Sequence, residues 1–147
     1  MKKRIYFVVF AMCCSCDPSE NLETEIINSS NSNLEISFIS RLILENEENN
    51  KETLKIKSDN SITYKKINVS NNGLGRAGLS LIDFDSIYLS NETNEILNVW
   101  KPDTPGKNIY NIDKYWTVRE TSKNHFVYTY EITNEDLIIE KRKKSIK

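Results

Sequence analysis

The strongest constraint on the fold of this chain is a two-residue alternation of side chains towards its C-terminal end. From Phe126 to Ile132 an aromatic or aliphatic side chain occupies every second position. Successive side chains of a β-strand point to opposite faces of the sheet, so this segment is predicted to be a strand with one buried face. Shorter stretches that we also expect to be strands are Leu34–Phe38, Leu42–Leu44, Leu54–Ile56, Ile62–Tyr64, Ile67–Val69, Leu79–Leu81, Ile87–Leu89 and Ile96–Trp100.

The spacing of these strands indicates the fold class. They recur at roughly ten-residue intervals, as in antiparallel sandwiches and barrels, and no segment longer than about nine residues carries a capped helical stripe. We therefore predict an all-β fold in which residues 34–140 form one antiparallel β-sandwich, immunoglobulin-like or transthyretin-like. A change of parity at Lys65-Lys66 predicts a bulge or strand junction, and Thr133–Asp136 predicts a turn that packs Leu137–Ile139 against the core.

The N-terminus has the features of an export signal. Three cations, Lys2, Lys3 and Arg4, precede the short apolar run Ile5–Met12, and small residues then lead to a polar stretch. This order is typical of a bacterial secretory signal peptide, and the run is too short to span a bilayer. We assign residues 1–15 to the signal peptide.

The end of this leader resembles a lipobox, the segment before the cleavage site of bacterial lipoproteins. Ser15 is the small residue before the cleaved bond, and Cys16 follows it. The resemblance implies that Cys16 carries a thioether-linked diacylglycerol and usually a further acyl chain on its new amino group. The commonest lipobox has leucine where this chain has Cys13, and Cys13 or Cys14 stays an alternative site of modification. Two or more acyl chains anchor a protein stably in a membrane.

Removal of the leader changes the chemistry available to the chain. If Cys16 becomes the first residue, it is the last cysteine left and the lipid occupies it, which excludes a disulfide or a thiol metal site. The single histidine, His125, cannot form a histidine-rich metal site, and no G-x-S-x-G motif accompanies it. The sequence Gly73–Gly78 fits G-x-G-x-x-G, but strand-like residues follow it instead of a helix. We predict no metal, no cofactor and no catalytic residue.

The nearly neutral net charge of −1 is the sum of three segments that differ in charge. Without the three cations of residues 1–15 the mature chain has a charge of −4, and five more cations lie in the basic tail, residues 141–147, so residues 16–140 carry −9. An acidic body argues against nucleic-acid binding, which depends on lysine and arginine contacts to phosphates. Residues 16–33, rich in Asn, Ser and Glu, are predicted to be a flexible tether.

Four aromatic residues are the remaining candidates for a binding surface: Trp100, Tyr110, Tyr115 and Trp116. They lie in or beside residues 101–124, which we expect to be one long loop, and long loops often carry function. Exposed together, the rings would form a stacking platform for a glycan or a contact patch for a protein partner. The alternative is that the two tryptophans close the end of the core.

The general layout resembles small bacterial lipoproteins of the Bacteroidota type, a group that has no assigned activity. The likeness includes the lipobox leader, the polar segment after it, the single β-domain and the aromatic strand that runs into an acidic turn, Tyr128–Asp136. We expect a membrane-anchored lipoprotein of the cell envelope, in the outer membrane, that is a non-catalytic binding or structural module for a protein partner or glycan. The alternative is a glycan-directed hydrolase or its accessory subunit.

Overall fold

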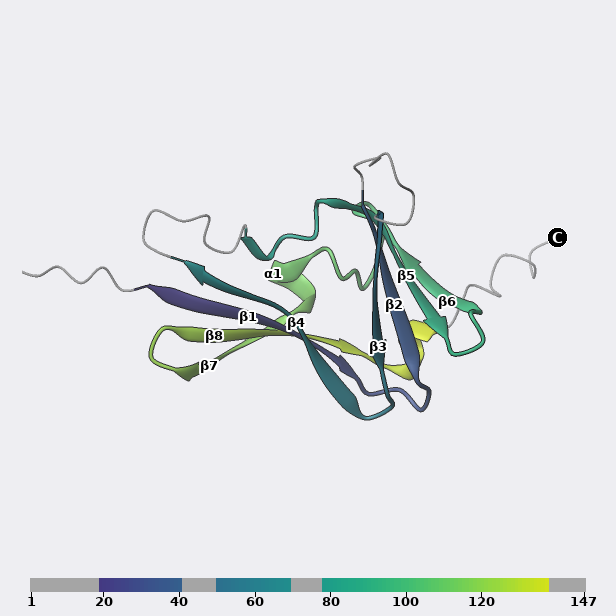
Figure 1. The fold of residues 1–147 in the computed structure, drawn as a ribbon, viewed down its shortest axis with the longest axis horizontal. Coiled ribbons are helices and arrows are strands. Elements are labelled where there is room, and N and C mark those ends of the chain that lie inside the picture. The colour runs from purple at the N-terminus through teal and green to yellow at the C-terminus, as the bar shows by residue number, and fades with distance from the viewer. Residues whose placement is uncertain (1–18, 41–49, 70–77, 138–147) are drawn as a thin grey trace, which may run out of the picture.

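Two four-stranded β-sheets pack face to face in the computed structural model (Figure 1), which describes residues 19–40, 50–69 and 78–137. The strand order is β4-β1-β8-β7 in the first sheet and β3-β2-β5-β6 in the second. The prediction of an all-β sandwich is confirmed. The elements are β1 (Glu20–Asn28), β2 (Leu34–Ser40), β3 (Lys51–Ile56), β4 (Asn60–Val69), β5 (Phe84–Asn91), β6 (Ile96–Trp100), α1 (Ile112–Tyr115), β7 (Thr117–Ser122), β8 (His125–Ile132) and the 3-10 helix η3 (Asn134–Leu137).

The core lies between the two sheets and follows the predicted alternation. Ile36 and Phe38 of β2 and Tyr130 and Ile132 of β8 are fully buried, and the alternation is clearest at Glu131, which is exposed between two of them. Burial of such side chains is the main favourable term in folding, because it removes apolar surface from water. Other buried apolar residues are Leu22, Ile26, Leu34, Ile56, Leu79, Leu81, Ile87, Leu89, Trp100, Ile109, Trp116 and Tyr128.

The predicted tether over residues 16–33 is wrong for half of its length, because residues 20–28 form strand β1 in the middle of the first sheet. Its inward positions are Leu22, Thr24, Ile26 and Asn28, and all four are buried. Thr24 donates a hydrogen bond to the backbone oxygen of Lys65 at 3.3 Å, and the Asn28 amide donates to backbone oxygens, one of them at 2.8 Å. These bonds satisfy the buried polar groups of a strand whose composition resembles that of a linker. The domain therefore begins at residue 20 and not at residue 34.

β1 pairs with both of its neighbours along nearly its whole length. It is antiparallel to β4 and parallel to β8, with Leu22 opposite Ile67 in β4 and opposite Phe126 in β8. β1 and β2 belong to different sheets, whereas the first two strands of a constant-type immunoglobulin domain share one sheet. The strand order thus differs from the immunoglobulin order within the same sandwich class.

Two local predictions agree with the structure. The register between β1 and β4 shifts at Thr24 and Glu25, and Tyr64 becomes the extra residue of a bulge next to the predicted position at Lys65-Lys66. The turn predicted after Thr133 is η3, whose Leu137 packs against the core. Several predicted features lie outside the described residues. They are the leader, Cys16, Leu42–Leu44, the first two glycines of Gly73–Gly78, Ile138, Ile139 and the basic tail.

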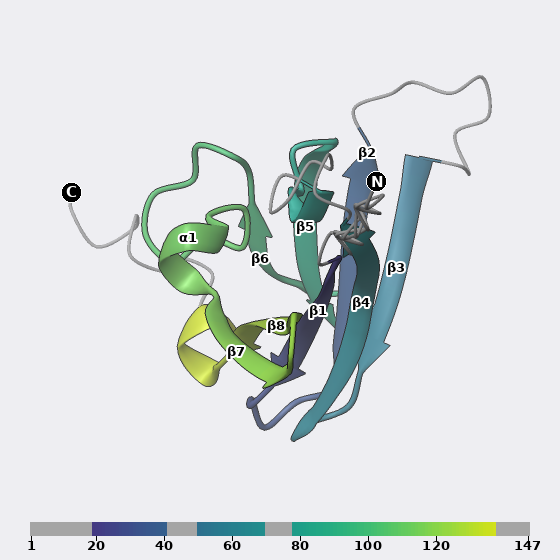
Figure 2. The same ribbon diagram turned by 90° about the vertical axis from the view of Figure 1, so that its left-hand side faces the viewer.

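The connection from β6 to β7 is shorter than predicted. Residues 117–122 form β7, so the loop comprises residues 101–116 and carries the helical turn α1, which Figure 2 shows beside β6 and above β7 (Figures 1 and 2). Every residue of β7 is exposed, so no apolar alternation marks this edge strand in the sequence. In the described ranges no helix has the length and apolar character to cross a bilayer.

Candidate functional site

The four aromatic residues predicted to form a surface patch do not lie together on the surface. Trp100 is 1% exposed and Trp116 is 7% exposed, so the prediction that they contact a ligand is wrong. Their rings contact Tyr130, with centroids 6.0 and 5.4 Å apart. Tyr110 and Tyr115 are partly exposed and also pack against the core. The two tryptophans close the core, as the alternative interpretation proposed, and only the tyrosines are accessible to a partner.

The indole groups also hold the loop of residues 101–116 in place. The Trp100 Nε1 donates a hydrogen bond to the backbone oxygen of Lys107 at 3.2 Å, and the Trp116 Nε1 donates to that of Ile109 at 2.8 Å. A buried indole N–H needs such a partner. The rings therefore bury apolar surface and fix the backbone of the loop.

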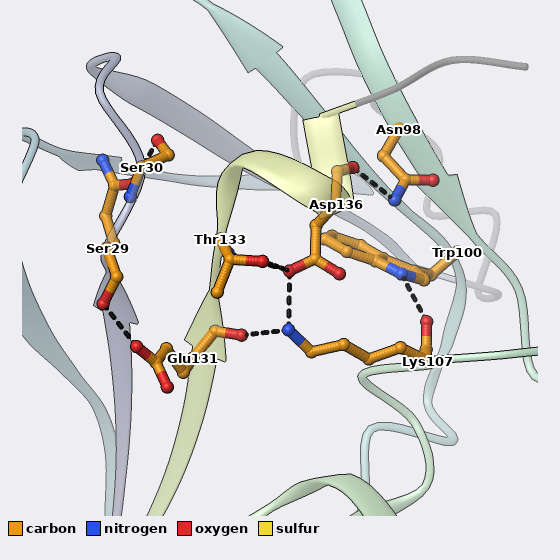
Figure 3. A network of polar contacts seen from close by, with 9 residues as sticks. Ser29, Ser30, Asn98, Trp100, Lys107, Glu131, Thr133 and Asp136 are labelled. Atoms are coloured by element: carbon orange, nitrogen blue, oxygen red, sulfur yellow. Dashed lines mark hydrogen bonds and ion pairs between the residues drawn. The ribbon is translucent and has the colours of Figure 1, made fainter.

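A partly buried ion pair, between the half-buried Lys107 and the buried Asp136, fixes the same loop to the end of β8 (Figure 3). The Lys107 Nζ donates to the Asp136 carboxylate at 2.6 Å and to the Glu131 backbone oxygen at 2.6 Å. The same carboxylate accepts hydrogen bonds from the backbone N–H and the hydroxyl of Thr133, at 2.8 and 3.1 Å. Because groups of the chain itself surround Asp136, this cluster acts as a structural clasp and not as a site for a ligand.

Hydrogen bonds of Asn108, a residue of the loop itself, also hold the loop backbone in place. Asn108 is buried, and its side-chain amide donates to the backbone oxygens of Lys101 and Thr104, at 2.8 and 2.9 Å. Its side-chain oxygen accepts a hydrogen bond from the Tyr110 N–H at 3.1 Å. The loop thus presents Tyr110 from a backbone that is already ordered, which lowers the entropy cost of binding.

A pocket of about 440 Å³ opens between this loop and the segment before β5, and we call it the loop pocket. Its volume is in the range of small-molecule sites, about 300–1,000 Å³. At the opening Ile82 is 60% exposed, and the Tyr110 hydroxyl donates to the Phe84 backbone oxygen at 3.4 Å. The lining residues are Ser80, Ile82, Pro102, Tyr110, Asn111, Ile112 and Asp113.

The lining of the loop pocket combines two kinds of group. Tyr110, Ile82 and Ile112 supply apolar surface, and Asn111 and Asp113 supply an amide and a carboxylate. A sugar ring presents the complementary chemistry, because its C–H face packs on apolar side chains while its hydroxyls exchange hydrogen bonds with amides and carboxylates. Of these residues only Tyr110 was predicted from the sequence. Ser80 and Ile82 belong to a segment that only the fold brings to the loop, and the other lining residues of the loop are not aromatic.

A second hollow of about 440 Å³ lies where β2 and β3 meet the β5–β6 turn. No aromatic residue lines it, and several of its polar side chains already have partners: Lys55 lies 3.5 Å from Glu35, and Asn33 donates to Glu92 at 2.9 Å. The loop pocket is therefore the better binding site. The second hollow is lined by Asn33, Leu34, Glu35, Lys55, Ile56, Lys57, Glu92 and Asn94.

The titratable groups on the outer face of the first sheet form cross-strand contacts around Glu23. The Thr63 hydroxyl donates to this carboxylate at 2.8 Å, Lys66 lies 3.3 Å away, and the His125 Nε2 lies 3.5 Å away. The hydrogen bond from Thr63 is the main reason that the pKa of Glu23 is below its ordinary value, although partial burial opposes the shift. The only histidine of the chain thus contacts a carboxylate that is already paired.

Comparison with known proteins gives no further assignment. No family model matches the chain, and no match was found among curated proteins or solved structures. In the part of the chain that the structure describes, no three residues among His, Cys, Asp and Glu lie together in a way that could hold a metal ion.

Proposed function

We propose that the chain is a lipid-anchored lipoprotein of the bacterial cell envelope, attached to the outer membrane through Cys16, whose β-sandwich is a non-catalytic glycan-binding module. The loop pocket is the observation that carries the binding role. Its apolar wall and its polar groups lie on a loop that Asn108 and Lys107 restrain. The leader and the lipobox resemblance support the anchor.

A protein partner is the second candidate for the same pocket. The exposed side chain of Ile82 at its opening favours this alternative, because apolar side chains at the centre of an interface contribute strongly to protein binding. A single protruding side chain of the partner would then fill the pocket. The two candidates differ in whether an isolated glycan binds.

The anchor is tested by replacing each leader cysteine in turn. Cys16→Ala is expected to abolish incorporation of radiolabelled palmitate and to release the protein from the membrane fraction, because the proposed thioether forms on the Cys16 thiol and alanine has none. Cys13→Ala and Cys14→Ala are matched controls that keep both properties. Continued acylation of the Cys16→Ala protein would show that the anchor is attached elsewhere.

The loop pocket is tested with an array of bacterial envelope glycans, followed by calorimetry with the glycan that binds best. Tyr110→Ala is expected to weaken binding about tenfold, since one ring contact contributes roughly 1.4 kcal/mol. Tyr88→Ala, on the outer face of the second sheet, is the matched control. Equal loss in both variants would contradict a site at Tyr110, and release of reducing sugar from the bound glycan would contradict a non-catalytic role.

A further inference from the structure

The proposed lipid and the rigid domain are separated by very little chain. β1 begins at Glu20, four residues after Cys16. Each residue of a fully extended chain adds at most about 3.6 Å, so the start of β1 lies within about 14 Å of the Cys16 Cα atom. A lipid on Cys16 therefore holds the first residues of β1 close to the headgroups of the bilayer.

Three parts of the first sheet meet at the start of β1, and we call this end of the domain the base. Glu20 pairs with Val69, the last residue of β4. The Asn21 N–H donates to the backbone oxygen of Asn124, in the β7–β8 turn, at 2.7 Å. Figure 1 shows the start of β1, the end of β4 and the β7–β8 turn together at the left of the molecule. Any surface that lies close to Glu20 therefore meets all three.

The opposite end of the same sheet, which we call the tip, lies one strand length away. Asn28, the last residue of β1, pairs with Ile132 and with Asn60. Beyond it the Asn31 N–H donates to the Asn134 side-chain oxygen of η3 at 3.1 Å. Nine residues of strand rise by about 27 Å between the first and the last Cα atom. The tip is thus well beyond the reach of the lipid.

Two properties of the base fit a layer of phospholipid headgroups. β1 is hydrogen-bonded to a neighbouring strand on both sides. The start of β1 therefore cannot detach from the sheet and lengthen the chain between the lipid and the domain. The base is also polar, because the exposed cation Lys123 of the β7–β8 turn and the exposed carboxylate of Glu20 both lie on it, and such groups suit the charged headgroup layer and not the hydrocarbon layer.

We propose that the base is a membrane-facing surface that lies on phospholipid headgroups, so that the domain stands on the bilayer with its tip outward. This proposal rests on the proposed anchor at Cys16 and adds a fixed orientation to it. The tip then faces the aqueous space.

The orientation is tested with single fluorescent labels on the full lipidated protein. The mature chain has no other cysteine, so Lys123→Cys at the base and Asn31→Cys at the tip each give one thiol for a bimane label. The proteins are reconstituted into vesicles of phosphatidylethanolamine and phosphatidylglycerol that contain a lipid with a nitroxide on its headgroup. We expect several-fold stronger quenching of the label at position 123 than of the label at position 31.

Other results separate the orientation from the anchor. Equal quenching of both labels in vesicle-bound protein would overturn the orientation and leave the anchor intact. Failure of the lipidated protein to join the vesicles would overturn the anchor and the orientation together.

A longer tether provides the matched control. Sixteen Gly and Ser residues inserted between Ser19 and Glu20 add a mean span of about 20–24 Å. The base should then leave the headgroups, and the quenching at position 123 should fall towards that at position 31. Unchanged quenching would overturn the claim that the short chain sets the orientation.

Discussion

A chain that lacks residues 16–33 is expected not to fold. Residues 20–28 form a central strand, and their removal would leave the facing edges of β4 and β8 without partners. It would also remove Leu22 and Ile26 from the core. Each buried aliphatic side chain of this kind contributes about 2–5 kcal/mol, and a whole domain is stable by only about 5–15 kcal/mol.

This prediction separates a strand from a tether in one measurement. A chain that begins at Ser19 and keeps β1 is the matched control, and we expect it to show the dispersed amide resonances of a folded protein. The chain that begins at residue 34 should give a collapsed spectrum and no cooperative urea transition. A cooperative transition in the shorter chain would show that β1 is dispensable.

The second large effect is expected from Trp100→Ala, which should lower the free energy of unfolding by about 3–5 kcal/mol. Trp100 is almost completely buried, and its ring packs against that of Tyr130 in a T-shaped arrangement. The substitution would leave a cavity and remove the hydrogen bond that orders the backbone at Lys107. Urea denaturation of the mature chain, with Cys16→Ser in place of the lipid, measures the change.

Two further variants show that this loss comes from core packing. Tyr110→Ala changes an aromatic residue of the same loop that is only partly buried, so a much smaller loss is expected. Tyr130→Phe removes a buried hydroxyl that has no hydrogen-bond partner in the described residues. Since an unsatisfied buried group costs about 1–3 kcal/mol, we expect this variant to be at least as stable as the parent. A Trp100→Ala protein of unchanged stability would contradict the position of this residue in the core.

The parts of the fold that the sequence predicts are those in which apolar residues alternate with polar ones. β2 and β8 bury an unbroken apolar face, so their period identifies them. The alternation does not reveal β1, because two of its four inward residues, Thr24 and Asn28, are polar. Their side chains form hydrogen bonds with backbone groups far away in the sequence. The alternation does not reveal β7 either, because this exposed edge strand has no buried face. Hydrophobic period detects burial, and a strand without an apolar buried face gives no signal.

The candidate site was harder to predict for a different reason. The sequence shows that aromatic residues gather around the 101–116 loop, but not which of them point inward. Trp100 ends β6 on its core-facing side, and Trp116 follows α1 into the same core. The pocket joins Ser80 and Ile82, which precede β5, to Asn111 and its neighbours, which follow β6. These segments meet because β5 and β6 pair in the second sheet, and the sequence does not show this pairing.

The parallel pairing of β1 with β8 has a consequence for how the chain reaches its native state. Ser29 and Glu131, which bond at the ends of these strands, are 102 positions apart. Contacts of such long sequence separation slow folding, because the intervening chain must be closed before they form. Among the strands of the described residues β1 is synthesised first, yet its sheet is completed only when β8 is made. If the chain is exported as its leader predicts, this topology delays folding until translocation is almost complete, which keeps the chain in the unfolded form that a narrow export channel requires.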